Sequence, residues 1–394
     1  MTDPSPLFLP PAEEIRQTFR EVATPSIVYD LDGIDRTVRI LREDMRPVEG
    51  ARLNLALKAT HTPEVLAHFA SIGLGADVAS VGEYDLARQA GFEMITATGP
   101  SFTADDFDRL GADGVHIDAS SIDQLVAFVD DRAGVDVGLR VRVPLPKSID
   151  DRYTTFGSLS RFGVDPTDEA LHRVLSNSAA RVRRLHTHTG QMTPTHLIYK
   201  TRYLLAIARH YPDVDSIDLG GGFFSLYIDR AAAVRAWEEV GRDVARFRAE
   251  TGRPITVIAE PGGALLAAHG YLVTTVCAVE ARHPGFGSAV VGVDSSAWNV
   301  APWHQPRVVP LTDQDGDESV APTMIAGNTL YENDFFGTDT RGKRRSFPLP
   351  PLTAGDRLVF TASGAYTMTN ARVFNRIPLP SQYVWRQRDG HAAL

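Results

Sequence analysis

Short runs of aliphatic and β-branched residues alternate with longer amphipathic stretches from about residue 26 to residue 260. The short runs predict eight β-strands, over residues 53–58, 75–79, 94–98, 114–118, 135–143, 181–188, 216–219 and 255–260. Between them, apolar residues three and four positions apart predict helices. Strand–helix repeats of this number and length predict a (β/α)8 barrel. The alternative, a doubly wound sheet, would need a phosphate-binding fingerprint after its first strand, and the sequence has none there.

After residue 260 the pattern changes to short strands joined by turns rich in proline and glycine, with little helix. These strands are predicted over residues 271–279, 288–293, 307–311, 323–326 and 357–362. The run Ser26–Asp30, ahead of the barrel, is expected to belong with them. The sequence therefore predicts three parts: an N-terminal segment of the β domain (1–34), the barrel (35–264) and a C-terminal all-β domain (265–394).

Composition narrows the class of protein. The 394 residues exceed one typical domain of roughly 100–200 residues. The formal net charge of −9 argues against nucleic acid as the main partner. No apolar run reaches the ~20 residues that cross a membrane, so no membrane association is expected. The start lacks the features of a secretion signal, and Cys277 is the single cysteine. We therefore expect a cytoplasmic protein.

Lysine is rare in this chain. Only four of the 40 basic residues are lysines: Lys58, Lys147, Lys200 and Lys343. Lysine can condense with a carbonyl, whereas arginine stays protonated. Barrels of this kind carry their active sites at the carboxyl ends of the strands. Alternation along residues 53–58 turns Lys58 toward the barrel axis at that end, which makes it the leading candidate. The alternative is a lysine that pairs with a carboxylate and has no catalytic role.

Three further strand ends carry polar groups. His186 and His188 fall on the same side of one strand end, where such a pair can bind a metal. The turn Gly220–Gly222 follows the next strand and would either offer backbone N–H groups to a phosphate or form a tight turn without a ligand. Glu260 ends the last strand and faces inward, where a buried carboxylate needs a partner such as a protonated ring nitrogen.

A lysine, a glycine turn, a histidine ring and a carboxylate at one rim together meet the requirements of pyridoxal 5′-phosphate. The lysine would hold the aldehyde and the glycine turn the phosphate. The histidine would stack on the ring, and the carboxylate would keep the pyridine nitrogen protonated. We therefore expect this cofactor and no metal ion.

The chain resembles the fold-type III pyridoxal-phosphate enzymes, the group that contains ornithine, arginine and diaminopimelate decarboxylases. The resemblance covers residues 24–385. Seven motifs carry it in order: ALKAT (56–60), GADVASVGEYDLARQAG (75–91), SRFG (160–163), HTHTG (186–190), DLGGGF (218–223), AEPGG (259–263) and GAY (364–366) followed by FN (374–375). The resemblance implies a β-sandwich or barrel as second domain, and a head-to-tail homodimer with shared active sites.

The resemblance also assigns roles to residues. It implies that Lys58 holds the cofactor, that His188 lies on its face and that Tyr366 reaches its phosphate. The cofactor-binding residues expected from the motifs are Lys58, His188, Gly220, Gly221, Gly222, Glu260, Gly262, Gly263 and Tyr366. Two phosphate contacts of the family need replacements, because Gly263 stands where the family has arginine and Gln191 where it has serine.

The chain departs from the family pattern in the segment 327–334. Leu330 stands where the family has a cysteine that returns a proton, and Tyr331 stands where it has an acidic residue that grips a distal amine. The later aspartate is retained as Asp334. Tyr331, Glu332, Asp334 and His304 are the candidates for binding the substrate. A simple diamino acid is therefore an uncertain substrate.

These features predict a decarboxylase of an amino acid or an amino-acid conjugate. A place in siderophore, antibiotic or other specialised biosynthesis is one expectation. Lys58, Tyr331, His188 or water would return the proton to the product. Two alternatives stay open: racemisation or decarboxylation-linked transamination with the same cofactor, and a catalytically dead relative that binds a partner protein.

Overall fold

A computed structural model describes residues 5, 7, 13–130, 132, 134–149, 155–157, 159–311, 320–339, 342–388 and 391–392. The chain divides into two compact units. The first comprises Met1–Phe8 and Thr37–Ala264, and the second comprises Leu9–Arg36 and Leu265–Leu394. The N-terminal segment and the C-terminal β region predicted from the sequence include residues outside the described set, among them 1–4, 8–12 and 312–319.

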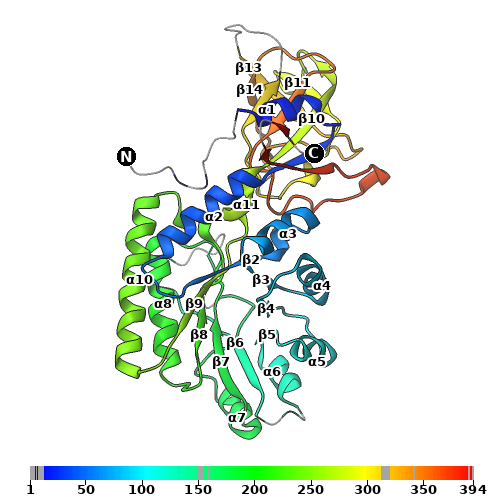
Figure 1. The fold of residues 1–394 in the computed structure, drawn as a ribbon. Helices are drawn as coiled ribbons and strands as arrows, with labels where there is room; N and C mark the ends of the chain where they lie inside the picture. Colours follow the sequence, from blue (N-terminus) through cyan, green and yellow to red (C-terminus); the bar gives the residue numbers. More distant parts are fainter. Residues whose placement is uncertain are drawn as a thin grey trace. The chain divides into compact units, whose positions relative to one another are not determined.

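The first unit is a closed barrel of parallel strands (Figure 1). Its strands, each paired with the next and the last with the first, are β2 (Arg52–Ala56), β3 (Gly75–Val78), β4 (Ile95–Thr98), β5 (His116–Ala119), β6 (Asp136–Arg140), β7 (Arg181–His186), β8 (Ser216–Asp218) and β9 (Thr256–Ala259). The (β/α)8 barrel predicted from the sequence is confirmed. Six of the eight strands end earlier than predicted, whereas β4 ends at Thr98 as predicted and β5 ends one residue later. At the early ends the chain turns into loops that carry polar side chains.

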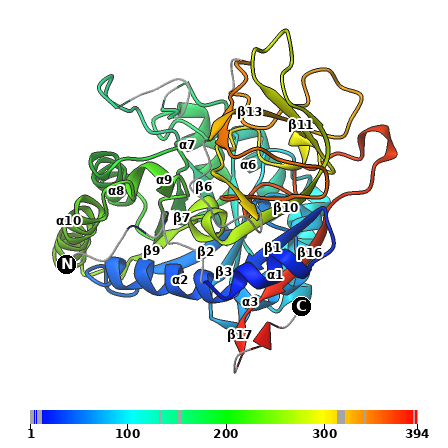
Figure 2. The same cartoon turned by 90° about the horizontal axis from the view of Figure 1, so that it is seen from above.

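Helices of the first unit lie outside the barrel. They are α3 (Pro63–Ser71), α4 (Val81–Ala90), α5 (Ala104–Ala112), α6 (Ile122–Val129), α7 (Glu169–Ser178), α8 (Pro194–Ala208), α9 (Phe223–Leu226) and α10 (Arg230–Thr251); α2 (Leu31–Met45) and α11 (Gly263–Leu266) span the division between the units. Figure 2 shows α8 and α10 side by side.

Helix α10 illustrates how sequence becomes structure here. Asp229 accepts a hydrogen bond from the Ala232 N–H at the start of the helix, and Gly252 ends it in a left-handed conformation. Trp237 and Phe247 belong to its buried apolar face. Burial of each such side chain stabilises the fold by about 1.5–3 kcal/mol, so the apolar spacing read from the sequence is what fixes the helix on the barrel.

The second unit is mostly sheet. Its strands are β1 (Ser26–Asp30), β10 (Gly270–Glu280), β11 (Ala289–Val293), β12 (Val308–Leu311), β13 (Ala321–Ala326), β14 (Phe347–Leu349), β15 (Arg357–Phe360) and β16 (Ser381–Trp385), with a small pair β17 (Gln387–Arg388) and β18 (His391–Ala392). Strand β1 pairs antiparallel with β10 and parallel with β16. Helix α1 (Ile15–Glu21) packs on this sheet through Ile15 and Phe19. The predicted all-β second domain is confirmed as a fold class, although β14 and β16 were not predicted.

No described helix has the length and apolar character that a membrane span requires.

Candidate active site

Lys58 follows the first barrel strand. The sequence predicted a strand through residue 58, but β2 ends at Ala56 and Lys58 lies in a 3-10 turn, η2 (Leu57–Ala59). The turn is closed by the Thr60 N–H, which donates to the Leu57 carbonyl at 3.0 Å. Leu57 is buried and Lys58 is exposed. The amine is therefore presented at the carboxyl end of the barrel by a turn rather than by strand alternation.

The charge of Lys58 acts on groups from three other strand ends. It opposes the rise in the pKa of Asp77 and of Glu260, which burial lifts well above their ordinary values. It also helps to hold the pKa of His188 well below its ordinary value, after burial as the main cause. The sequence placed Lys58, His188 and Glu260 at one rim, and the structure brings them together there.

His188 is oriented by the glycine turn. Its Nδ1 atom accepts a hydrogen bond from the Gly221 N–H at 3.2 Å. Nδ1 therefore carries no proton, and because the pKa of the ring is low, the neutral tautomer has its hydrogen on Nε2. A neutral, half-buried imidazole of fixed orientation suits the ring-stacking role inferred from the sequence.

Glu260 belongs to a buried charge network that the sequence analysis missed. The Nη2 atom of Arg184 lies 3.0 Å from an oxygen of Asp118, 3.1 Å from Asp218 and 3.3 Å from Glu260. His186 Nε2 lies 3.3 Å from the other oxygen of Glu260. All five side chains are buried. The sequence held a signal for the missing residue, because Arg184 precedes His186 and His188 at strand spacing and so shares their inward side.

The carboxylates of this network outnumber its cations. Burial lowers the pKa of His186 to about 4, so the ring is neutral near pH 7. Burial, followed by the charge of Asp218, raises the pKa of Glu260 well above its ordinary value. Glu260 is thus a carboxyl that favours its protonated form even beside Arg184. A protonated ring nitrogen is the partner that would let it ionise.

The charge network also bears on the alternative that this strand end binds a metal ion. Ligand atoms of His186, Asp218 and Glu260 lie within 4.8 Å of one another, a spacing that a metal could use. However, the Arg184 guanidinium already lies against both carboxylates. We therefore interpret these three residues as part of a charge network.

The glycine turn is built more tightly than the sequence analysis expected. Gly220 and Gly222 have φ values of +62° and +90°. A Cβ atom on Gly222 would come within 1.8 Å of the Gly190 carbonyl oxygen. The turn can therefore exist only with glycine at these positions.

Two N–H groups of this turn are used inside the protein. The Gly220 N–H donates to Asp218 Oδ1 at 2.8 Å, and the Gly221 N–H donates to His188. This corrects the expectation that all three glycines offer N–H groups to a phosphate. Among the described residues the Gly222 N–H has no acceptor, and α9 begins directly after it. An anion would therefore meet the Gly222 N–H directly before α9. Gly262 and Gly263, at the start of α11, stay predictions.

The substrate-binding candidates lie in the second unit. Asp334 is buried, and its carboxylate accepts hydrogen bonds from the N–H groups of Ala297 (2.8 Å) and Thr329 (3.2 Å), and from the hydroxyls of Ser296 (3.1 Å) and Thr329 (2.7 Å). His304 is buried too, with Nε2 at 2.8 Å from the Thr361 carbonyl oxygen. Both side chains hold loops together, and their assignment to substrate binding stays a prediction.

Tyr331, Glu332 and Tyr366 stay predictions. Tyr331 is partly exposed, with its ring centroid 4.7 Å from that of Trp298. Glu332 is exposed. Tyr366 has a φ of +58°, and its ring lies 5.3 Å from that of Trp303. Leu330 is 91% exposed, so this apolar side chain is fully presented at the position where the resemblance implies a cysteine.

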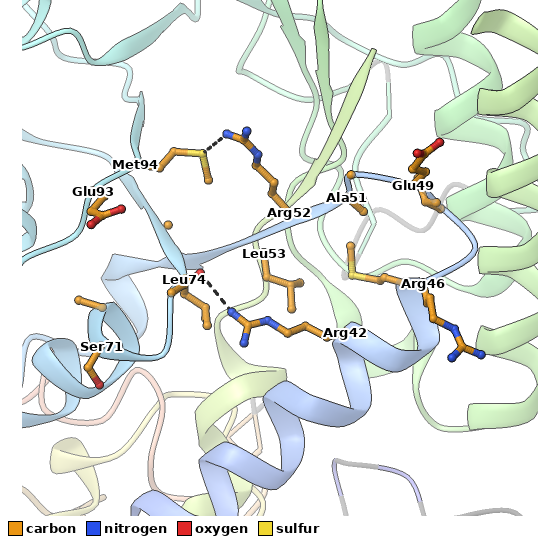
Figure 3. Close-up of a pocket in the computed structure, with 16 residues that line it drawn as sticks. Arg42, Arg46, Glu49, Ala51, Arg52, Leu53, Ser71, Leu74, Glu93 and Met94 are labelled. Carbon is orange, nitrogen blue, oxygen red and sulfur yellow. Dashed lines mark hydrogen bonds between the residues drawn. The ribbon is translucent and has the colours of Figure 1, made fainter. Parts of the chain in front are cut away.

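A pocket of about 790 Å³ opens at the opposite end of the barrel (Figure 3). It lies beside the amino-terminal ends of β2 and β3, away from Lys58. Arg42 donates there to the carbonyls of Ile72 (2.8 Å) and Gly73 (3.1 Å) at the end of α3, and Arg52 donates to the sulfur of Met94. These arginines satisfy local acceptors, and a cavity at this end of a barrel is not where catalysis is expected.

The electrostatics and donor set of the rim fit pyridoxal phosphate. Lys58 supplies the amine, His188 a neutral ring, Glu260 a buried carboxyl able to face a ring nitrogen, and Gly222 an N–H group without an acceptor among the described residues. The fit concerns the chemistry of the residues, independent of any bound ligand.

Comparison with known proteins agrees. Over residues 31–267 the chain matches the family model described as pyridoxal-dependent decarboxylase, pyridoxal binding domain. It is 26% identical to an L-glutamyl-[BtrI acyl-carrier protein] decarboxylase of Niallia circulans, over 95% of this chain and 91% of that protein. It is also 26% identical to a lysine/ornithine decarboxylase of Selenomonas ruminantium, over 97% and 94%.

A solved structure shares the fold. A diaminopimelate decarboxylase crystal structure matches with a TM-score of 0.83 at 22% identity, covering 100% of this chain and 94% of that one. The family model covers more than half of the chain, and the relatives cover nearly its full length. The chain therefore belongs to the pyridoxal-dependent decarboxylase family.

Proposed function

We propose that this chain uses pyridoxal phosphate to decarboxylate an amino acid or an amino-acid conjugate. The observation that carries the proposal is the placement of Lys58 at the barrel mouth, where its charge acts on Asp77, His188 and Glu260. When bound, the cofactor supplies an aldehyde that condenses with amines and a ring that accepts the electron pair left as the carboxylate departs.

The protein's own groups would prepare this chemistry. The hydrogen bond from Gly221 fixes the plane of His188, so that a flat neutral face is offered to the ring. Glu260 keeps its raised pKa until a cationic ring nitrogen lies against it, and it is positioned by Arg184 and His186. A carboxyl at that nitrogen favours electron withdrawal, and therefore supports decarboxylation over racemisation.

The proton that completes the reaction needs a donor other than residue 330, because leucine has none to give. Lys58 is one candidate, since its amine lies at the rim. His188 is another, because its fixed tautomer carries hydrogen on Nε2. Tyr331 is the third, if a second copy of the chain delivers it.

The substrate class follows from what the second unit presents. Asp334 is engaged with its own loops, and Leu330 and Tyr331 offer apolar and aromatic surface. None of these three side chains would bind a distal ammonium group. A larger amino acid or a conjugate fits this surface better than a free diamino acid. One relative is named for a glutamyl group carried on a protein, which makes carrier-linked substrates worth testing.

We further propose a homodimer with shared sites. Leu330, Val373 and Phe374 are exposed apolar side chains of the second unit, at 91%, 61% and 41%. Exposed apolar surface of this kind marks an interaction site. Analytical ultracentrifugation of the wild type and of Leu330→Glu tests it: the variant should dissociate more readily, and a monomeric wild type would remove the proposal.

Two measurements test the function. Purified protein incubated with pyridoxal phosphate should gain a visible absorbance band, which Lys58→Ala loses and Lys147→Ala keeps. Lys147 is an exposed loop lysine and so a matched control. Release of CO2 is then measured over lysine, ornithine, diaminopimelate, glutamate and glutamyl thioesters. A wild type that takes up no cofactor would contradict the proposal, and cofactor uptake with racemisation but no CO2 would replace decarboxylation.

A further inference from the structure

Lys200 occupies the middle of the apolar face of α8. Its neighbours on that face, among them Leu197, Leu204 and Ala208, are buried against the barrel, and Lys200 itself is 0% exposed. A buried ammonium group is costly unless it is compensated. Burial gives no reason for lysine here, because leucine or alanine would fill a buried position without the cost of removing an amine from water.

The amine of Lys200 reaches the base of the glycine turn. It donates a hydrogen bond to the main-chain carbonyl of Leu219, the residue directly before Gly220. That carbonyl is the only acceptor of Lys200 among the described residues, and none of their salt bridges includes it. Lys200 is therefore a buried amine behind the turn, without a carboxylate in contact among the described residues.

The charged groups around Lys200 do not neutralise it. Asp218 and Glu260 favour its charge from the ends of β8 and β9, while Arg140 of β6 opposes it. His188 and His196 also face it, and its charge lowers the pKa of both. Asp218 and Glu260 are already engaged with Arg184. Burial, the largest cause, lowers the pKa of Lys200 to about 7.

The turn in front of Lys200 lacks positive charge of its own. Gly263 and Gln191 replace the arginine and the serine that the resemblance implies at a phosphate site. Gln191 turns its Oε1 atom toward the Ser225 N–H of α9 at 3.3 Å, so it occupies a donor rather than adding one. The Gly222 N–H is left as a donor without an acceptor among the described residues.

We propose that Lys200 is a positioning residue for the cofactor's phosphate: it holds the glycine turn through the Leu219 carbonyl and takes up one proton from solvent when the phosphate dianion binds. The inference rests on the proposed function, because it requires the cofactor. Lys200, on helix α8 behind the glycine turn, would supply the positive charge that Gly263 and Gln191 do not.

Comparison of pyridoxal phosphate with pyridoxal isolates this effect. Both ligands share the ring and the aldehyde, and the internal hemiacetal that free pyridoxal forms weakens its binding equally in every variant. The change in the ratio of the two dissociation constants with pH and between variants therefore reports the phosphate. The ratio is measured by absorbance titration of the apoprotein from pH 7 to 9, where a free phosphate monoester is mostly dianionic. In the wild type the advantage of the phosphate should fall with rising pH, by up to about tenfold per unit.

Variants decide the role of Lys200. Lys200→Met should lose about tenfold of the phosphate advantage at pH 7 and show no dependence on pH, whereas Lys147→Met should behave as the wild type. Lys200→Arg, which stays charged, should keep the advantage without the dependence. An unchanged ratio and slope in Lys200→Met would overturn the inference.

A measurement on the wild type covers the case in which these variants do not fold. Calorimetry at pH 8 in two buffers of different ionisation enthalpy gives the protons taken up with each ligand. About one proton more with pyridoxal phosphate than with pyridoxal supports the inference, and no difference overturns it. A protein that binds pyridoxal phosphate but fails this test retains the proposed function, whereas one that binds neither ligand overturns both.

Discussion

Removal of the Arg184 guanidinium should destabilise the barrel strongly. In Arg184→Met the carboxylates of Asp118, Asp218 and Glu260 would lose the cation that lies 3.0–3.3 Å from each of them. Loss of one partner from a buried ion pair typically costs about 3–5 kcal/mol, because a charge is left buried and uncompensated. We expect a loss in this range for the free energy of unfolding of the apoprotein at pH 7, measured by urea titration followed by circular dichroism.

A control on the same strand separates this effect from a general loss of arginine. Arg181 pairs with Asp136 at 2.7 Å on the surface, and Arg181→Met should leave the free energy of unfolding close to the wild-type value. The double variant Arg184→Met/Asp118→Asn should recover part of the loss, since one stranded charge is gone. A loss below about 1 kcal/mol in Arg184→Met would refute the interpretation of these residues as one charge network.

Three further predictions concern single residues. The pKa of Glu260 is raised in the folded apoprotein, so the folded protein keeps a proton that the unfolded chain releases above the ordinary pKa of 4.5. The stability that this group contributes is therefore lost as the pH rises. Glu260→Gln should lose less stability than the wild type between pH 5 and 8 in thermal melts. Gly222→Ala should destabilise the protein by more than about 1–3 kcal/mol and abolish cofactor uptake. Gly252→Ala, also at positive φ but with open space around it, should lose less stability and keep the cofactor. Equal losses of stability in the two variants would contradict the packing argument. Asp334→Ala should lower the unfolding free energy by about 1–3 kcal/mol without changing the order of substrate preference. A changed order would instead identify Asp334 as a substrate-binding residue.

The barrel was predictable because its signals are local. Apolar spacing such as that of Trp237 and Val240 repeats along the chain, and each strand is a short apolar run between turns. The strand ends were less predictable. Lys58 and His188 were predicted to lie in strands, but both lie just beyond them. At the rim the main chain stops pairing with neighbouring strands and forms turns, such as the one closed by Thr60.

The buried polar groups were hardest to predict. Asp334 and His304 stay candidates for binding the substrate, but their hydrogen bonds to residues 37 and 57 positions away could not be predicted from sequence. The place of Lys200 could not be predicted either, because only tertiary structure shows where its amine ends. Residue type indicated the chemistry at Lys58 and Glu260, but partners such as Arg184 are a property of the folded barrel.

The identity of the lysine that holds the cofactor tests the central claim most directly. Borohydride reduction of the protein loaded with pyridoxal phosphate attaches the cofactor permanently to that lysine, and peptide mass spectrometry then locates it among the four in the chain. The label should appear on Lys58. A label on Lys147, Lys200 or Lys343, or on none of the four, would contradict this account.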